Sequence, residues 1–273
     1  MGLLLIGYVG FADYRIDPVT GSQQFQPQSE VLSESTTQAL AKPEAKTDPK
    51  TQPKNQPLAQ APAPASQPAV GSVEKYSQHT VTASIYGIGE GADESNNFIS
   101  NVPSAWSSNA VGEFGGVDNM EGQRSFTPKH NSFYYALPAT EFNDSGLVPG
   151  AREKSPWASE IKNLRSNTSL FKGRWVRVSR TVNGQVKTIY AQWQDVGPNE
   201  EQDYGYVFGN GSQKPKNTFG VHAGIDLSPD IAKELGFTVA QGSASVTWSF
   251  VDSANVPNGL WKKYPAIDNK IRW

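Results

Sequence analysis

The alternation of apolar and polar positions along the chain predicts a domain built mainly of β-strands. Residues 175–182 and 185–195 are rich in β-branched and aromatic side chains, and Asn183 and Gly184 between them are typical of the tight turn in an antiparallel hairpin. Shorter runs of the same kind predict four more strands, at residues 80–86, 133–137, 223–227 and 244–251. We therefore expect one folded domain with six main strands.

Two short helices are expected between these strands. Ser155 is typical of a residue that precedes a helix, and proline follows it, so a helix is predicted to continue to about residue 164. The residue types after the strand at 223–227 predict a second helix over residues 228–235, with Ser228 as its N-cap. Gly236 then supplies the left-handed conformation that commonly ends a helix.

Strand periodicity places two aspartates at notable positions. Because side chains alternate between the two faces of a strand, Asp195 is expected to share its face with three apolar residues of the hairpin: Ile189, Ala191 and Trp193. By the same rule, Asp226 points away from its apolar neighbours Ile225 and Leu227. A carboxyl group at the edge of an apolar face is a candidate for a raised pKa, which a general acid needs near neutral pH. The alternative for Asp195 is an ordinary turn residue before Gly-Pro.

Composition divides the chain into four parts. Residues 1–16 hold an apolar run of about a dozen residues, shorter than the roughly 20 of a spanning helix, and are expected to be a membrane anchor or signal remnant. A frayed, cleaved or artefactual end is the alternative. Residues 17–76 are rich in Gln, Pro and Ala and predict a disordered tether with a reach on the order of 100 Å. Residues 77–252 form the predicted domain, and residues 253–273 a tail packed on it.

Charge and cysteine content narrow the function. The chain has 24 basic and 26 acidic side chains, a net charge of −2 and no run of Lys or Arg, which argues against a nucleic-acid partner. It has no cysteine, which excludes disulfides and thiolate metal sites and favours a bacterial source, while it says little about the compartment. The three histidines, His79, His130 and His222, are too far apart in sequence to suggest ligand spacing. We predict no metal and no cofactor.

Five motifs, taken in order, resemble those of a double-psi β-barrel. They are Thr-Ala-Ser-Ile-Tyr-Gly at 82–87, Ala-Leu-Pro at 136–138, Gln-Asp-Val-Gly-Pro at 194–198, Gly-Ile-Asp-Leu-Ser-Pro at 224–229, and the strand at 246–251. The chain resembles the barrels of rare lipoprotein A and of expansins, and more distantly family 45 endoglucanases. The resemblance covers about residues 79–252 and implies a mainly β fold, a six-stranded double-psi β-barrel with long insertions and short helices.

The resemblance also implies a site. It places Asp195 in the glycan groove, as the acid of lytic peptidoglycan cleavage or the essential carboxylate of wall loosening, and Asp226 on the same groove. Tyr86 matches a position that lines the groove. For Asp226 the alternative is a structural carboxylate. Glu90 or Asp93 could supply a second carboxylate, as an inverting glycosidase requires, and an ordinary loop role is the alternative for both.

Aromatic side chains offer candidate platforms for sugar rings. Trp193, Tyr204 and Tyr206 are candidates for substrate binding, because aromatic faces give large contact areas at little entropic cost. Packing in the core is the alternative. The chain departs from the family in the long segment 197–224, which could reshape the groove and decide the substrate. A second long segment, 92–130, is expected to be a long ordered loop anchored by Trp106 and Phe114.

These observations lead to three hypotheses. The first is an envelope enzyme, similar to a lytic transglycosylase, that cleaves peptidoglycan with Asp195 as general acid and with Asp226 assisting. The second is an expansin-like module that binds or loosens wall glycans without turnover. The third is a scaffold whose acidic insertion binds a partner protein. In the first two the partner is a cell-wall polysaccharide, peptidoglycan or a β-glucan. We expect a monomer in the bacterial periplasm or outside the cell, tethered by its N-terminus.

Overall fold

The computed structural model describes residues 75–118 and 127–273. The expected anchor at 1–16 and almost all of the expected tether at 17–76 lie outside the described residues. The strands are β1 Gln78–Ile85, β2 Tyr134–Leu137, β3 Phe142–Asn143, β4 Gly146–Leu147, β5 Trp175–Val182, β6 Gln185–Val196, β7 Ile225–Leu227 and β8 Ser243–Val251. The α-helices are α1 Ala110–Phe114, α2 Tyr204–Phe208 and α3 Pro229–Leu235. Short 3-10 helices span Glu94–Asn96, Arg152–Lys154, Ala158–Asn163, Val239–Gln241, Ser253–Asn255 and Leu260–Lys262.

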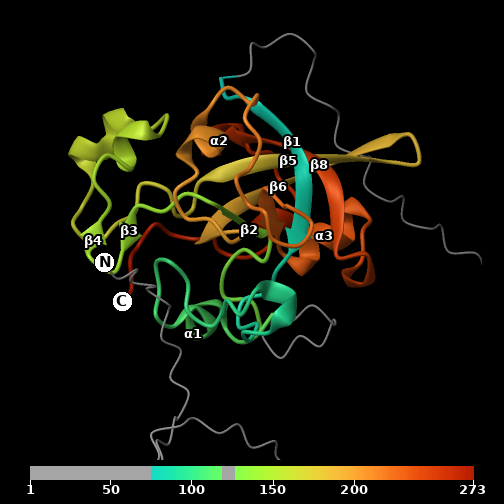
Figure 1. Cartoon of the computed structure of the whole chain (residues 1–273), viewed down its shortest axis with the longest axis horizontal. Helices are drawn as coiled ribbons and strands as arrows, with labels where there is room; N and C mark the ends of the chain where they lie inside the picture. Colours follow the sequence, from blue (N-terminus) through green and yellow to red (C-terminus); the bar gives the residue numbers. More distant parts are fainter. Residues whose placement is uncertain (1–74, 119–126) are drawn as a thin grey trace, which may run out of the picture. The chain divides into compact units, whose positions relative to one another are not determined.

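Six of the strands close into a barrel (Figure 1). The order around the ring is β1, β7, β2, β6, β5 and β8. β1 pairs with β7 and β2 with β6 in parallel, and the other four pairs are antiparallel. If β1 is exchanged with β6, β2 with β7 and β5 with β8, every strand keeps equivalent neighbours in the same relative directions. The barrel therefore has two topologically equivalent halves, and the expected mainly β fold with a closed six-stranded barrel is confirmed.

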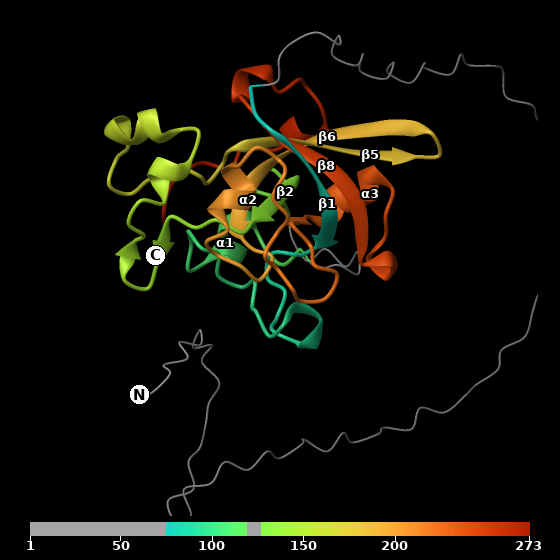
Figure 2. The ribbon, with the colours of Figure 1, turned by 45° about the horizontal axis from the view of Figure 1, so that its top comes forward.

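Local sequence accounts for most of these elements. The hairpin forms as predicted: β5 and β6 pair from Trp175 opposite Gln192 to Val182 opposite Gln185. Its turn projects beyond the barrel in two views (Figures 1 and 2). Gly236 ends α3 with a φ of 73°, as expected from its left-handed preference.

Two details of the helix predictions are wrong. Ser228 occupies the N-cap of α3, but its hydroxyl donates to the Ser132 carbonyl at 2.8 Å instead of accepting from the helix. The helix predicted from Ser155 is a 3-10 helix that begins only at Ala158. The Ser155 hydroxyl donates to the Arg152 carbonyl at 2.8 Å, so Ser155 closes the preceding turn. Local hydrogen bonds of this kind compete with helix capping.

The barrel interior is filled by apolar side chains from its strands. Trp193 is completely buried in this core, stacked on Phe171 with ring centroids 5.4 Å apart and on Tyr135 at 5.9 Å. Trp248 and Tyr206 are also completely buried. This packing of large rings fixes which residues of each strand face inward and therefore which face outward.

A second apolar cluster lies against the outer face of the barrel, under the segment that leads to α1. It consists of Tyr86, Ile88, Ala110, Phe114, Tyr134, Ala136 and Ile267. The chain near residue 272 pairs with this segment: the Arg272 amide donates to the Trp106 carbonyl at 2.8 Å and the Ser108 amide to the Arg272 carbonyl at 3.0 Å. Trp106 and Phe114, the expected anchors of the segment 92–130, are both buried.

Within residues 75–118 and 127–273, no helix has the length and apolar character needed to cross a membrane.

Candidate functional site

Four side chains form a row across neighbouring strands of the barrel. Ser84 of β1 lies opposite Asp226 of β7, Asp226 lies opposite Ala136 of β2, and Ala136 lies opposite Asp195 of β6. Directly opposed residues project to the same face of a sheet. The neighbours of Ser84, Ala136 and Asp226 along their strands belong to the interior core, so the row faces outward. With about 4.8 Å between strands, the Cα atoms of the two aspartates are roughly 10 Å apart.

A β-bulge turns Asp195 to this outer face. Tyr135 pairs with Trp193, but the next residue of β2, Ala136, pairs with Asp195, so Gln194 is one extra residue in β6. Such a bulge reverses the alternation of side chains beyond it. Trp193 therefore stays in the interior while Asp195 points outward. The expectation that Asp195 shares a face with Ile189, Ala191 and Trp193 is wrong, whereas the orientation expected for Asp226 is correct.

Asp226 is a partly buried carboxyl group with a single hydrogen-bond donor among the described residues. The Ser84 hydroxyl donates to its Oδ1 atom. Its Oδ2 atom lies beside Gly197, 3.4 Å from the point that a Cβ of that residue would occupy. Burial raises the pKa of Asp226 to about 7, with the Ser84 hydrogen bond acting to lower it and the charge of Glu90 to raise it. Asp226 can therefore be protonated near neutral pH.

Asp195 is held more tightly. Its exposed fraction is 8%, and its Oδ1 atom accepts hydrogen bonds from the Ala105 amide at 2.9 Å and the Val196 amide at 2.8 Å. Burial raises the pKa of Asp195 to about 7, the two amides act to lower it, and the charge of Asp226 acts to raise it. The Trp193 indole donates to the Asp195 carbonyl at 2.7 Å and fixes the backbone there.

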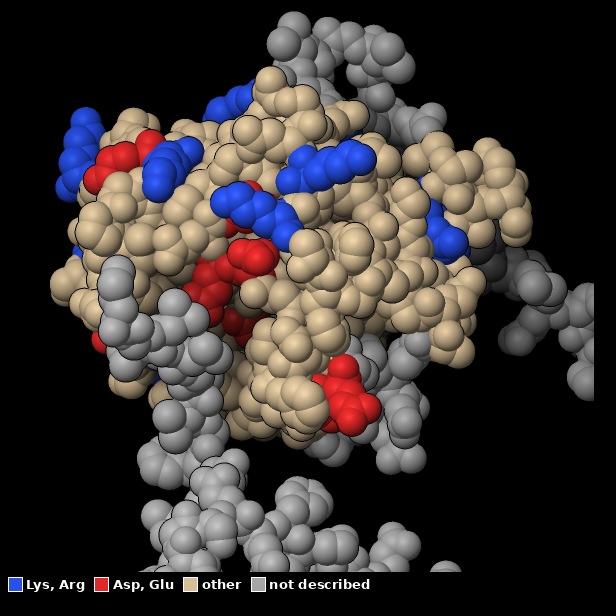
Figure 3. Space-filling view, in the orientation of Figure 1, with Lys and Arg blue, Asp and Glu red and all other residues tan. Residues whose placement is uncertain are grey.

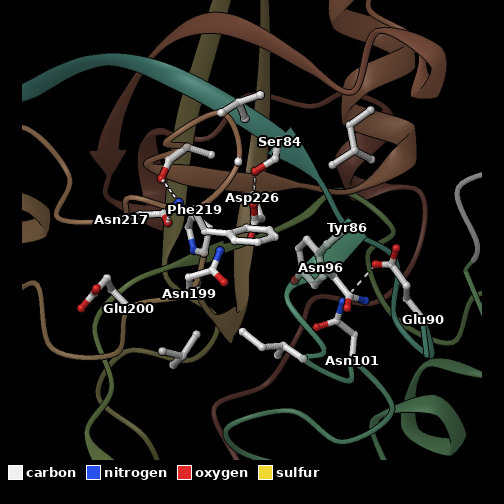
Figure 4. A pocket seen from close by; sticks show the side chains of 18 of the residues that line it. Ser84, Tyr86, Glu90, Asn96, Asn101, Asn199, Glu200, Asn217, Phe219 and Asp226 are labelled. Atoms are coloured by element: carbon white, nitrogen blue, oxygen red, sulfur yellow. Dashed lines mark hydrogen bonds between the residues drawn. The ribbon is translucent and has the colours of Figure 1, made fainter. Parts of the chain in front are cut away.

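A cavity of about 410 Å³ opens beside Asp226. Its walls come from the ends of β1 and β6, the segments on either side of α2, and the loop after β1. Its lining includes Glu201 and the labelled residues Ser84, Tyr86, Glu90, Asn101, Asn199, Glu200, Asn217, Phe219 and Asp226 of Figure 4. A hydrogen bond from Asn97 Nδ2 to Asn199 Oδ1, 3.2 Å long, joins the loop after β1 to the loop after β6.

Three of the residues predicted for the site line this cavity: Tyr86, Glu90 and Asp226. The Tyr86 hydroxyl donates to Gln194 Oε1 at 2.8 Å, and burial, followed by the charge of Asp195, raises its pKa. Glu90 Oε2 accepts from Asn101 Nδ2 at 3.0 Å, and burial raises its pKa. Asp195 is not among the lining residues. Of the two predicted catalytic aspartates, Asp226 is therefore the one that a ligand in the cavity can reach.

The three predicted aromatic platforms lie in the core instead. Trp193 and Tyr206 are completely buried, and Tyr204 is 7% exposed. The Tyr206 hydroxyl donates to the Gly224 carbonyl at 2.9 Å and accepts from the Trp248 indole at 3.1 Å. The Tyr204 hydroxyl donates to the Thr140 carbonyl at 3.0 Å. The alternative of core packing holds for all three, so the part of segment 197–224 that forms α2 is structural.

Several residues of the cavity were not singled out from the sequence. Ser84 belongs to the first motif and follows the outward alternation of β1, so its position could have been found by counting. Asn101, Asn199, Asn217 and Phe219 lie in loops, where no periodicity predicts orientation. Asn217 is fixed by its own loop, because its side chain donates to the Ala223 carbonyl at 3.0 Å and accepts from the Phe219 amide at 2.9 Å.

Across the two described ranges of the chain, no group of three or more His, Asp or Glu side chains is arranged to hold a metal ion.

The solved structures that are similar to this chain include a cerato-platanin. No family model matches the sequence, and no curated protein matches it. The crystal structure of cerato-platanin 3 from M. perniciosa is 14% identical and covers 64% of this chain and 96% of its own, with a TM-score of 0.29. A superposition of that quality supports no conclusion about fold or function.

The geometry of the site is suited to proton transfer. A carboxyl group with a pKa of about 7 can hold a proton at neutral pH and release it to a bound molecule. Asp226 faces the cavity, and the amide and hydroxyl groups around it offer hydrogen bonds to a polar ligand. Asp195 lies one strand beyond Ala136 and adds a second titratable group nearby.

Proposed function

We propose that the cavity binds a strand of an envelope polysaccharide and that Asp226 donates a proton to a glycosidic oxygen. One observation is the main support: the carboxyl group that faces the cavity has a pKa of about 7 and is oriented by the Ser84 hydroxyl. Asn side chains offer hydrogen bonds to sugar hydroxyls, and the ring of Phe219 offers a face for stacking. The resemblance to wall-active barrels favours peptidoglycan or a β-glucan as the polymer.

The proposed cleavage uses Asp226 as its only accessible acid. The proton of Asp226 passes to the glycosidic oxygen as the bond between that oxygen and the anomeric carbon breaks. In a lytic cleavage, a hydroxyl group of the same sugar attacks the anomeric carbon, and its proton returns to the Asp226 carboxylate. Atoms and charge balance without water. Asp195 acts as a positioning residue, since it lies outside the cavity lining and its Oδ1 atom accepts from the Ala105 and Val196 amides, which holds the end of β6 in place.

A second candidate function is glycan binding without turnover. It is favoured by the position of Asp195, whose Oδ1 atom is occupied by two backbone amides and which does not line the cavity. A site with one accessible carboxyl group can bind and deform a strand without cleaving it. In both cases we propose the bacterial envelope, periplasmic or extracellular, as the location.

The experiment compares the full chain with three variants, Asp226→Asn, Asp195→Asn and Glu153→Gln, on peptidoglycan and on cellulose, with products identified by mass spectrometry. Glu153 is exposed and is not one of the residues that line the cavity, so its variant is the control. Asp226→Asn should reduce product formation by about 10²-fold or more, and Asp195→Asn by about tenfold at most. Sedimentation with polymer and no products would favour the second candidate. Products that persist in Asp226→Asn would contradict the acid role.

A further inference from the structure

The loop from residue 90 to residue 101, which follows β1, is compact and its two ends meet. The Gly89 amide donates to the Asn101 carbonyl at 2.8 Å, and the Asn101 amide donates to the Glu90 carbonyl at 2.9 Å, so two backbone bonds close its base. Further hydrogen bonds join residues 91–99 to one another. Surface loops of this kind, with close ends and internal contacts, are frequently functional. Because it is closed on itself, the loop can move as a unit.

This loop has no core of its own. None of the described side chains from residue 90 to residue 101 is buried. In contrast, Ile88 before the loop and Trp106 after it are almost completely buried. A segment with few buried apolar contacts has a low local stability. The loop is therefore anchored at its base and is not held by packing along its length.

One wall of the cavity belongs to this loop. Four of its residues line the cavity: Glu90, Asn96, Ile99 and Asn101. Figure 4 shows Asn96 and Asn101 on one side of the cavity and Asn199 on the other. Figure 3 shows a hollow with acidic side chains on one face of the domain, which agrees with the four carboxyl groups of the lining: Glu90, Glu200, Glu201 and Asp226. The cavity is thus open to the surface and bordered by the loop.

A side-chain hydrogen bond connects the loop to the opposite wall. Asn97 Nδ2 donates to Asn199 Oδ1 at 3.2 Å. Both residues have left-handed backbone conformations, with φ of 57° at Asn97 and 55° at Asn199, which asparagine tolerates better than most residues. A hydrogen bond between side chains that solvent reaches contributes little net free energy, because water can replace either partner. The bond can therefore open and close readily.

Phe98 has an exposed ring at the mouth of the cavity. It is 69% exposed and lies between Asn97, which reaches across to Asn199, and Ile99, which lines the cavity. Its φ of 57° is in the left-handed region, where a bulky side chain is strained. Strain of this kind is found at ligand clamps and switch regions. The ring fills no part of the core, so its faces are available to a ligand.

Apolar side chains also border the mouth on its other side. Val221 is 51% exposed, and both Val221 and Phe219 line the cavity. Ile99, 44% exposed, lines it from the loop. Exposed apolar groups gathered at a hollow are typical of ligand-binding grooves. A sugar ring presents C–H groups on its faces and can stack between apolar and aromatic side chains placed in this way.

We propose that residues 90–101 act as a flap that opens to admit a glycan strand from the side and closes on it through the Asn97 to Asn199 hydrogen bond. In the closed state a sugar ring lies between Phe98 and the opposite wall. This inference rests on the proposed function and assigns Phe98 to the binding of the glycan. Closure excludes water from the sugar beside Asp226, which strengthens the hydrogen bonds of the site.

The first test concerns Phe98. Binding of two β-1,4-linked hexamers, one of N-acetylglucosamine and one of glucose, to the full chain is measured by calorimetry near neutral pH. Phe98→Ala should weaken the binding of whichever hexamer binds wild type by about tenfold, and Phe98→Tyr should keep most of the affinity because it keeps an aromatic face. Val186→Ala is the matched control, since Val186 is also an exposed apolar residue but lies in β6 and does not line the cavity.

The second test concerns the opening of the flap. The chain has no cysteine, so Asn97→Cys with Asn199→Cys can be joined specifically by a short bis-thiol linker that a reducing agent removes. In the linked protein the flap cannot open, and sedimentation with peptidoglycan and with cellulose should be lost and should recover after reduction. Asn97→Cys alone, treated with the same reagent, is the control and should still sediment with the polymer.

The two proposals fail in different ways. Equal affinities of wild type and Phe98→Ala for the hexamers would show that Phe98 does not contact the sugar. Unchanged sedimentation of the linked protein would show that the strand enters without movement of the flap. Either result would overturn the inference and leave the proposed glycan function intact, because wild type still binds. If wild type binds neither hexamer and neither polymer, the proposed function fails, and the flap has no glycan to close on.

Discussion

Strands β6 and β7 each place an aspartate opposite Ala136, yet the two carboxyl groups have different surroundings. Asp195 at the end of β6 is covered by the segment before α1 and accepts from two backbone amides. Asp226 in β7 accepts from the Ser84 hydroxyl and faces a cavity. The pKa of each is about 7, chiefly because of burial. A raised pKa therefore does not by itself separate a positioning carboxyl group from an accessible one.

The difference between them is access. Two amide donors favour the ionised form of Asp195 and partly offset the effect of its burial. The single hydroxyl at Asp226 leaves its second oxygen next to Gly197, where no side chain intervenes. Residues that carry out chemistry must reach the ligand, and of the two only Asp226 lines the cavity.

The largest expected effect is on stability. Because the pKa of Asp195 rises from 3.8 to about 7 on folding, the folded state holds this proton more tightly than the unfolded state. Its contribution to stability is complete below about pH 4 and is lost as the pH rises to about 7. Asp195→Asn cannot ionise and keeps an oxygen for both amides. The variant should therefore gain a few kcal/mol relative to wild type between pH 4 and pH 8, measured by urea unfolding.

Two controls support this measurement. Asp195→Ala removes the acceptor of both amides and should be less stable than Asp195→Asn at every pH. Asp252→Asn affects a carboxyl group whose pKa is lowered by its hydrogen bond with Lys75, so it should show no gain between pH 5 and pH 8. A constant difference between Asp195→Asn and wild type across this range would show that the pKa of Asp195 is not raised.

A smaller effect is expected on the pKa of each carboxyl group when one of its hydrogen-bond donors is removed. Ser84→Ala removes the only donor to Asp226 among the described residues, and Ala105→Pro removes one of the two amides that donate to Asp195. Losing a donor to the charged form should raise the pKa of the carboxyl group concerned by about one unit. The measurement is a carbon-13 titration of both carboxyl groups, with thermal unfolding to confirm that each variant is folded. Equal shifts of both groups in both variants would mean that the pair titrates as one unit.

The smallest effect concerns Gly197. Its φ of 149° and the 3.4 Å approach of Asp226 Oδ2 mean that Gly197→Ala adds backbone strain and a methyl group beside that oxygen. We expect a loss of about 1 kcal/mol in the free energy of unfolding and a small further rise in the pKa of Asp226 alone. Gly184→Ala is the control, since φ there is 78° and open space surrounds the added Cβ. If both variants leave the Asp226 titration unchanged, Gly197 does not shape the site.

The sequence predicted the strands well because their signals are local. Asn-Gly between two β-rich runs defined the hairpin, and the alternation around Asp226 gave its direction correctly. The same rule failed at Asp195, because a bulge adds one residue to β6 opposite β2, and nothing in residues 189–195 alone reveals which residue is extra. The alternation of side chains along a strand does not show where a bulge shifts the pairing with the next strand.

The cavity was harder to predict because it depends on contacts between distant segments. Glu90, Asn199 and Phe219 meet from three loops, and loop direction has no periodic signature. The aromatic residues Tyr204 and Tyr206 have the composition of a sugar platform, yet their hydroxyl groups have partners inside the domain. Composition identifies rings that could stack on a sugar, whereas burial decides whether a sugar can reach them.

The pairing of Arg272 with the segment over Asp195 also bears on the order of folding. The Ser108 and Arg272 contact joins residues 164 positions apart, whereas the β5 and β6 hairpin closes over a turn of two residues. Contacts of such separation form late, because the loop-closure entropy must be overcome before they contribute. During refolding, the hairpin should therefore be protected from hydrogen exchange before the Ala105 amide is, and the environment of Asp195 would be among the last parts of the domain to mature.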